Sequence, residues 1–272
     1  MSVTATDIQR ALHDLGLGGR PVCLHASLRS FGHVTGGGDA VVEGFLAAGC
    51  TLLVPTFTSR FAVRPCDEEL LARNAFPLHE RDAGATDPYT PDTTEVDAEM
   101  GAIPAAVARW SGHVRGDHPL DSFSAVGPLA WELVHGQQPE DVYAPLRELA
   151  QRDGSVTLAG VGLERLTLLH LAEAEAGRVL FRRWAAGAGG RTVRVAVGGC
   201  SEGFGGLAPA LEPLARRARV GESRWMVLPA AATLEAATRA IRANPEVTRC
   251  ADPDCERCRD AIAGGPMVEA RP

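Results

Sequence analysis

The chain has 272 residues, 45% of them hydrophobic, and a formal net charge of -7 at pH 7. Its length is enough for one large domain or two small ones with a substantial core. The acidic balance argues against nucleic-acid binding, which usually requires a basic stripe, and it suits a cationic small-molecule substrate.

The basic residues are all arginines, 27 in number. Arginine, helix N-termini or backbone amides would therefore have to hold any anionic cofactor. No apolar run approaches the roughly 20 residues that cross a bilayer, and the N-terminus lacks the basic start and apolar core of a signal peptide. We therefore expect no membrane partner and a cytoplasmic protein whose seven cysteines stay reduced.

The N-terminal part predicts a helix capped by Thr4 or Thr6, followed by a strand–helix–strand unit. We expect the helix at residues 4–15, the first strand at 21–27 and a glycine-rich loop at 27–38. The second helix is expected at 39–48 and the second strand at 51–54. Strands at this interval are parallel, which indicates an α/β fold.

The loop at 27–38 offers anion-binding groups directly before a helix. The Ser27 hydroxyl and the backbone amides of Gly36, Gly37 and Gly38 can approach a pyrophosphate closely. The alternative is an ordinary turn, which is what most triple glycines form.

Residues 59–99 are irregular and polar, and they are long for a connection without structure of its own. This length predicts a lid or a binding loop. The later half of the loop is acidic, with carboxylates at Asp87, Asp92, Glu95, Asp97 and Glu99. These carboxylates would attract the ammonium groups of a substrate, although such charge runs are usually solvated surface.

The stretch after residue 156 carries the main functional signal. An apolar run ends at Gly160 and Gly162, which predicts a buried strand, a turn and then a helix. Thr167, His170 and Glu173 are three residues apart and so share one face of that helix. His170 can accept a proton near neutral pH, with Glu173 fixing its tautomer; the alternative is a core histidine capped by its neighbour.

The C-terminal third predicts a connection at residues 181–190 and a strand at 192–197. A helix is expected at 207–217, a strand at 224–228 and a last helix at 231–243. Gly199-Cys-Ser-Glu-Gly203 after the first strand fits the pattern of a nucleophile elbow. We reject that interpretation, because all eight histidines precede Ser201 and no helix-forming run follows it.

Three cysteines near the end, Cys250, Cys255 and Cys258, have metal-ligand spacing. They predict a structural zinc site in a tail at 250–258, with a fourth ligand from Cys66 or a distant histidine. The alternative is three ordinary thiols.

Several of these stretches resemble the aminoglycoside 3-N-acetyltransferase family. The resemblance rests on Thr-x-x-His-x-x-Glu after a Gly-x-Gly turn and on the stretches at 25–28, 55–58, 100–104 and 115–119. Gly116 and Ala144 stand where the family usually has serine. The resemblance implies one α/β domain over residues 1–272, with a central, mostly parallel or mixed sheet flanked by helices.

The family's activity implies transfer of an acetyl group from acetyl-coenzyme A to an amine of an aminoglycoside or related amino sugar. The residues assigned to coenzyme A are Ser27, Leu28, Arg29, Gly36, Gly37 and Gly38, and those assigned to the acceptor are Thr58, Asp97 and His118. His170 would act as the base, oriented by Glu173, with Thr167 a candidate for holding the oxyanion.

Two alternatives stay open: a biosynthetic acyltransferase acting on another acceptor, and a non-catalytic member held by a zinc-pinned tail. The resemblance suits either antibiotic resistance or antibiotic biosynthesis, and it leaves open whether the protein is a homodimer.

Overall fold

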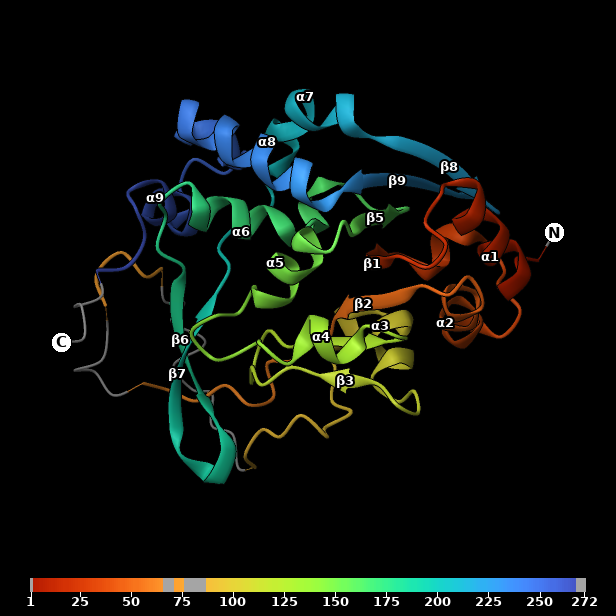
Figure 1. Cartoon of the computed structure of the whole chain (residues 1–272). Coiled ribbons are helices and arrows are strands. Elements are labelled where there is room, and N and C mark those ends of the chain that lie inside the picture. Colours follow the sequence, from red (N-terminus) through yellow and green to blue (C-terminus); the bar gives the residue numbers. More distant parts are fainter. Residues whose placement is uncertain (1, 66–70, 76–86, 268–272) are drawn as a thin grey trace.

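A seven-stranded sheet forms the centre of the computed structural model, which describes residues 2–65, 71–75 and 87–267 (Figure 1). Its strands are β1 (Pro21–Ala26), β2 (Thr51–Pro55), β3 (Val114–Arg115), β4 (Phe123–Val126), β5 (Ser155–Ala159), β8 (Arg216–Val220) and β9 (Ser223–Pro229). The strand order is β3-β4-β2-β1-β5-β9-β8. The three central strands are parallel and the pairs on either side are antiparallel, so the sheet is mixed.

A separate antiparallel hairpin joins β6 (Phe181–Ala186) to β7 (Thr192–Val197). In Figure 1 it stands on the opposite side of the molecule from α1 and α2. The helices are α1 (Ala5–Asp14), α2 (Gly37–Ala47), α3 (Ala102–Val107), α4 (Ala130–Val134), α5 (Ala144–Gln151), α6 (Leu168–Glu175), α7 (Ala208–Leu211), α8 (Ala230–Ala243) and α9 (Glu256–Ile262). Within the described residues, no helix is both long enough and apolar enough to cross a bilayer.

Short 3-10 helices connect several of these elements. They are η1 (Leu28–Phe31), η4 (Ala98–Met100), η5 (Leu163–Arg165), η6 (Ala188–Gly190), η7 (Phe204–Leu207), η8 (Glu212–Leu214) and η9 (Pro245–Thr248).

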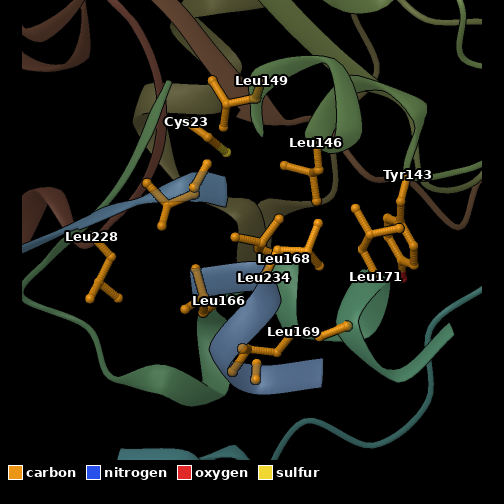
Figure 2. Close-up of a cluster of buried hydrophobic side chains, with 14 of the residues drawn as sticks. Cys23, Tyr143, Leu146, Leu149, Leu166, Leu168, Leu169, Leu171, Leu228 and Leu234 are labelled. Carbon is orange, nitrogen blue, oxygen red and sulfur yellow. The ribbon is translucent and has the colours of Figure 1, made fainter. Parts of the chain in front are cut away.

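The two faces of the sheet are covered by different helices. Alternate residues of β1 point to opposite sides, so that Val22 and Leu24 join a core with α1, α2 and α3, whereas Cys23 joins a core with α4, α5, α6 and α8. Figure 2 shows the second core, where leucines of α6 such as Leu168 and Leu171 lie beside Leu146 of α5. This packing fixes α6, the helix that carries the predicted catalytic residues.

The predicted fold class and the parallel β1–α2–β2 unit are confirmed. Two C-terminal predictions were wrong. The expected connection at 181–190 contains β6, in which Arg182 and Arg183 hide the apolar pattern of a strand. The expected helix at 207–217 is reduced to α7 and η8, because Pro213 has no N–H to continue the helical bonding and the next residues pair with β9.

The packing of α1 against the sheet gives a first prediction. Leu12 is fully buried in the core that α1, α2 and α3 share, so Leu12→Ala should lower the free energy of unfolding by about 2–5 kcal/mol through lost burial and a residual cavity. Arg10 lies on the same helix with its side chain 65% exposed, and Arg10→Ala should change stability by about 0.5 kcal/mol or less. Urea unfolding of both variants measures the difference, and equal losses would contradict this placement of α1.

Candidate active site

The loops after β1 and β5 meet at the C-terminal ends of these two parallel strands. The Ser27 amide donates to the Ala159 carbonyl over 3.0 Å, and Gly160 takes a φ of +69° in the turn that follows. A Cβ on Gly160 would lie 2.1 Å from the Ser30 side chain, so only glycine fits this close approach. The chain then passes through η5 and enters α6.

His170 and Glu173 form a buried pair on α6. His170 Nδ1 lies 2.8 Å from Glu173 Oε2, and the two residues are only 8% and 5% exposed. Because an ionised carboxylate only accepts hydrogen bonds, Nδ1 carries the proton and the Nε2 lone pair is the basic one. The i, i+3 spacing thus produces the interaction that the sequence predicted.

The second oxygen of Glu173 is held by residues far from α6 in sequence. Arg178 Nη1 donates to Glu173 Oε1 and also to Thr248 Oγ1, the latter over 2.8 Å, and the Thr248 hydroxyl donates to Oε1 over 3.3 Å. Arg178 Nη2 donates to the carbonyl of Pro245 over 2.5 Å. The carboxylate is therefore fixed on one side by the imidazole and on the other by Arg178 and Thr248.

Two aromatic rings fix the plane of the imidazole. Tyr143 stacks on His170 with ring centroids 6.1 Å apart and an interplanar angle of 10°, and Phe204 meets it edge-on at 4.7 Å. A Cβ on Gly198 would lie 2.5 Å from Tyr143 Oη and 2.7 Å from His170 Cδ2, so the chain after β7 approaches both rings as only glycine can.

Asp121 is a second carboxyl group near His170, and no local pattern in the sequence points to it. Loss of hydration raises the pKa of the Asp121 carboxyl to about 7, against the opposing attraction of His170 and Arg183. Asp97 is close enough for its charge to raise this pKa further. A carboxyl group that titrates near neutrality beside a histidine is a feature of catalytic sites.

His118 contacts the backbone of Asp121 and supports it. It is fully buried; Nδ1 accepts the Asp121 amide over 2.8 Å and Nε2 donates to the Ala196 carbonyl over 2.9 Å. Burial lowers the pKa of the His118 imidazole to about 4, so it stays neutral with a fixed tautomer. Both ring nitrogens are engaged within the protein, which makes His118 a support for Asp121 in place of the predicted substrate contact.

The other predicted substrate residues shape one loop beside Asp121. The Thr58 amide donates to the Leu120 carbonyl over 2.8 Å, and Thr58 itself is 3% exposed. Asp97 is partly exposed, and its Oδ2 accepts the Ser59 amide over 2.9 Å. Of this pair, Asp97 is the one with a charged and partly accessible side chain. The carboxylates predicted at 87, 92, 95 and 99 are each exposed.

The predicted cofactor residues lie around η1 and the start of α2. Ser27 and Leu28 are partly exposed and Arg29 is exposed. Gly36 and Gly37 take positive φ values of 88° and 61° and lead into α2.

Gly38 has a packing role within this group. A Cβ there would lie 2.7 Å from the Ala102 carbonyl of α3, so glycine allows α2 and α3 to approach.

Thr167 directly precedes α6 and is 9% exposed, and its carbonyl accepts the His170 amide over 3.0 Å. It therefore lies within one turn of His170, as the sequence predicted.

The C-terminal cysteines gather around a fourth that the sequence analysis did not select. The Sγ atoms of Cys200, Cys250, Cys255 and Cys258 all lie within 4.8 Å of one another, and we refer to these residues as the cysteine cluster. Cys66, named from the sequence as a candidate fourth ligand, lies outside the described residues.

Comparison with known proteins identifies the family. The model of the aminoglycoside 3-N-acetyltransferase family matches residues 23–242, a stretch that runs from β1 into α8 and includes α6. The chain belongs to the aminoglycoside 3-N-acetyltransferase family.

The members of the family that match this chain cover different shares of its length. Aminoglycoside N(3)-acetyltransferase IX of Micromonospora chalcea is 35% identical over 63% of this chain and 62% of its own length, so the match spans less than two thirds of that relative. The solved structures of aminoglycoside acetyltransferase AAC(3)-IVa in complex with a gentamicin and of AAC-IIIb with CoASH share the fold. Their TM-scores are 0.78 and 0.72 at 22% identity, covering 97% and 89% of this chain and 98% and 97% of theirs.

The structure explains one departure from the family's motif. A Cβ on Gly116 would lie 1.9 Å from Gln137 Oε1, the atom that accepts the Phe123 amide over 2.9 Å. A serine at 116 and this position of Gln137 exclude one another. The hydroxyl that the family usually has there is replaced by a hydrogen bond that holds β4.

The residues that sequence reasoning missed share a common property. Arg178, Thr248, Tyr143, Phe204 and Asp121 contact the catalytic pair or its surroundings from other parts of the chain. Of these five, Arg178 had a local signal, since it lies three residues after the end of α6 and the helix dipole favours a cation near a helix C-terminus.

Asp121 gives a prediction for the pH dependence of stability. Its pKa is near 7 in the folded protein and near 3.8 in the unfolded chain, so between these values the unfolded state binds fewer protons and stability falls as pH rises. Asp121→Asn should remove this decline, giving a flatter dependence of the urea midpoint between pH 4 and 7. Asp117→Asn, at an exposed neighbouring position, should keep the wild-type slope. Identical slopes in the two variants would show that Asp121 ionises normally.

Proposed function

We propose that the protein transfers an acetyl group from acetyl-coenzyme A to an amine of an aminoglycoside or a related amino sugar. The observation that carries the proposal is the buried His170–Glu173 pair, in which Nδ1 is bound to a fixed carboxylate and Nε2 is left basic. Membership of the family and the names of its characterised members support the same reaction.

The proposed reaction is direct transfer within a ternary complex. The acceptor amine attacks the thioester carbonyl, a C–N bond forms, and His170 Nε2 takes a proton from the amine. Glu173 stabilises the imidazolium that results. When the tetrahedral intermediate collapses, the C–S bond breaks and the imidazolium returns the proton to the leaving thiolate. Thr167 and backbone amides at the start of α6 are our candidates for holding the oxyanion.

Acetyl-coenzyme A is proposed to lie along η1 and the start of α2. Ser27 and Arg29 offer a hydroxyl and a cation on the accessible side of this loop, and the N-terminus of α2 adds backbone amides. The Ser27–Ala159 hydrogen bond brings this loop next to the turn that leads to α6. The CoASH complex of AAC-IIIb, which shares the fold, supports this class of co-substrate.

The acceptor is proposed to be cationic. The Asp121 carboxyl lies close enough to both His170 and Asp97 for their charges to shift its pKa, and the chain has a net charge of -7. Ammonium groups of an amino sugar would be attracted to such carboxyl groups, and the gentamicin complex of AAC(3)-IVa supports the same chemistry. Acetylation removes one of these charges, which suits a role in antibiotic resistance. We also propose a reducing, cytoplasmic setting, in keeping with the free cysteines.

A biosynthetic acyltransferase with a different acceptor is the second candidate. The differences from the family at Gly116 and Ala144 favour it, since they remove two hydroxyls. A screen of aminoglycosides, amino sugars and simple amines, with release of free thiol as the readout, separates the two. A non-catalytic protein would neither release thiol nor bind acetyl-coenzyme A in a calorimetric titration.

The base assignment gives a direct prediction. His170→Ala should reduce kcat at least about 100-fold and leave acetyl-coenzyme A binding unchanged, because proton transfer is lost without loss of cofactor contacts. Glu173→Gln should cost less, since the amide oxygen can still accept from Nδ1–H. His135→Ala, at an exposed histidine bonded to the Trp131 carbonyl, is the control and should retain full turnover. A fully active His170→Ala would exclude His170 as the base.

The cofactor assignment is tested at Gly37. A Cβ there meets no atom within 4 Å. Gly37→Phe should therefore block the loop and weaken acetyl-coenzyme A binding at least about tenfold, with a stability loss of about 1–2 kcal/mol from its φ of +61°. Gly112→Phe is matched, with a φ of +79° and equally open surroundings. It should show the stability loss alone. Calorimetric titration decides, and unaltered affinity in Gly37→Phe would place the cofactor elsewhere.

A further inference from the structure

The cysteine cluster joins two parts of the chain that are about fifty residues apart. Cys200 follows β7. Cys250 and Cys255 precede α9, and Cys258 lies within it. A tetrahedral zinc ion with Zn–S bonds of about 2.3 Å places its four sulfurs about 3.8 Å apart. The four Sγ atoms, all within 4.8 Å of one another, already approach this geometry.

The chemistry of the cluster selects zinc among common metals. Four thiolates are soft ligands, which favour zinc over magnesium or calcium, and they fill a tetrahedral site completely. The Cys250 amide donates to Cys258 Sγ over 3.4 Å, a contact that stabilises thiolate charge. Arg249 lies close enough to interact electrostatically with Cys250 and Cys258, and its positive charge can offset the net negative charge of a tetrathiolate site.

We propose that the cysteine cluster binds one structural zinc ion, and that this ion fixes the two segments that position His170 and Glu173. The metal site stands independently of the reaction, whereas the positioning role rests on the proposed acetyl transfer. The sequence predicted a zinc site that only pins the tail. The contacts around the cluster extend that role to the active site.

The Cys200 segment reaches His170. Phe204, four residues after Cys200, packs its ring edge against the imidazole at 4.7 Å. A Cβ on Gly203 would lie 2.2 Å from the Thr248 carbonyl, so the two segments that supply the cysteines touch backbone to backbone. Any shift between them moves Phe204 relative to Thr248.

The Cys250 segment reaches Glu173. Thr248, two residues before Cys250, donates to Glu173 Oε1 and accepts from Arg178, and the carbonyl of Pro245 in the same turn accepts from Arg178. After α9 the chain returns to the same region, because the Val179 amide donates to the Gly264 carbonyl over 2.9 Å. Both sides of the catalytic pair are thus attached to segments that the cysteine cluster joins.

The short 3-10 helix η9 has one side against the protein, where Thr248 is 3% exposed and Val247 packs against the core, and one side at the surface. Pro245, Glu246 and Arg249 are exposed or partly exposed, and the ion pair of Arg249 is with its neighbour Glu246. Four metal–sulfur bonds would anchor this segment far more firmly than its surface contacts do.

Metal content tests the site without reference to activity. Protein purified without added metal should contain about one zinc per chain by elemental analysis, and Cys200→Ser should retain less than a tenth of an equivalent. Cys50→Ser is the control: Cys50 is a buried thiol outside the cluster that donates to the Leu17 carbonyl over 3.2 Å, and serine keeps that donor. A full equivalent in Cys200→Ser would overturn the site as proposed. So would wild-type protein with less than a tenth of an equivalent and no rise in melting temperature on adding zinc.

If Cys200→Ser does not fold, the site can be tested in the wild-type protein instead. Cobalt(II) added to chelator-treated wild type should give thiolate-to-metal charge-transfer absorption that saturates at one equivalent and is abolished by zinc. Absence of this absorption would overturn the site.

The positioning role is read from kinetics of folded protein. Zinc-free wild type, held below its melting temperature, should lose about tenfold in kcat with the KM for acetyl-coenzyme A unchanged, and zinc should restore it. With zinc bound, Thr248→Val should show a similar loss in kcat, and removing zinc should lower its kcat little further. Thr248→Ser keeps the hydroxyl, so its kcat with zinc bound should be close to that of wild type. Full kcat in zinc-free protein would overturn the positioning role. An inactive wild type that still binds zinc would instead overturn the proposed function.

Discussion

The candidate active site depends on one carboxylate that is held inside the protein. Glu173 is 5% exposed, and a buried carboxylate is unfavourable unless charges and hydrogen bonds replace its water. Here Arg178 supplies the charge, Thr248 a hydroxyl and His170 the polarised N–H. Removing any one of these three groups would leave the buried carboxylate incompletely compensated. His170 is therefore held by the same interactions that make the buried carboxylate tolerable.

The sheet brings these groups together. Parallel strands β1 and β5 end at the same edge, so the loop before α2 and the turn before α6 lie side by side. The antiparallel strand β9 then carries the chain back to α8 and η9, which returns Thr248 to the end of α6. The hairpin of β6 and β7 delivers Gly198 and Phe204 to the other side of the imidazole. The mixed sheet thus allows the C-terminal third to complete a site begun by the parallel core.

Local spacing predicted the centre of the site but not its surroundings. The i, i+3 spacing of His170 and Glu173 is a property of one helix, and the strand–helix–strand interval likewise depends on neighbouring residues. Thr248 and Cys200 could not be found in this way, because their partners are brought close only by tertiary packing. Cys200 was also hidden within the pattern of a nucleophile elbow. His118 shows the converse: a histidine beside the site was assigned to the substrate, although burial and two internal hydrogen bonds give it a supporting role.

The 75 residues that follow Glu173, up to and including Thr248, also order events during synthesis. At about 5–20 residues per second, a ribosome needs roughly 4–15 s to add them. During that interval the parallel core and α6 can form, while the buried carboxylate still lacks its last hydrogen-bond donor. In a nascent chain whose α6 has just left the ribosome, the His170–Glu173 pair therefore still lacks the Thr248 hydroxyl. The His170–Glu173 pair is therefore completed late, when the segment that carries Thr248 arrives.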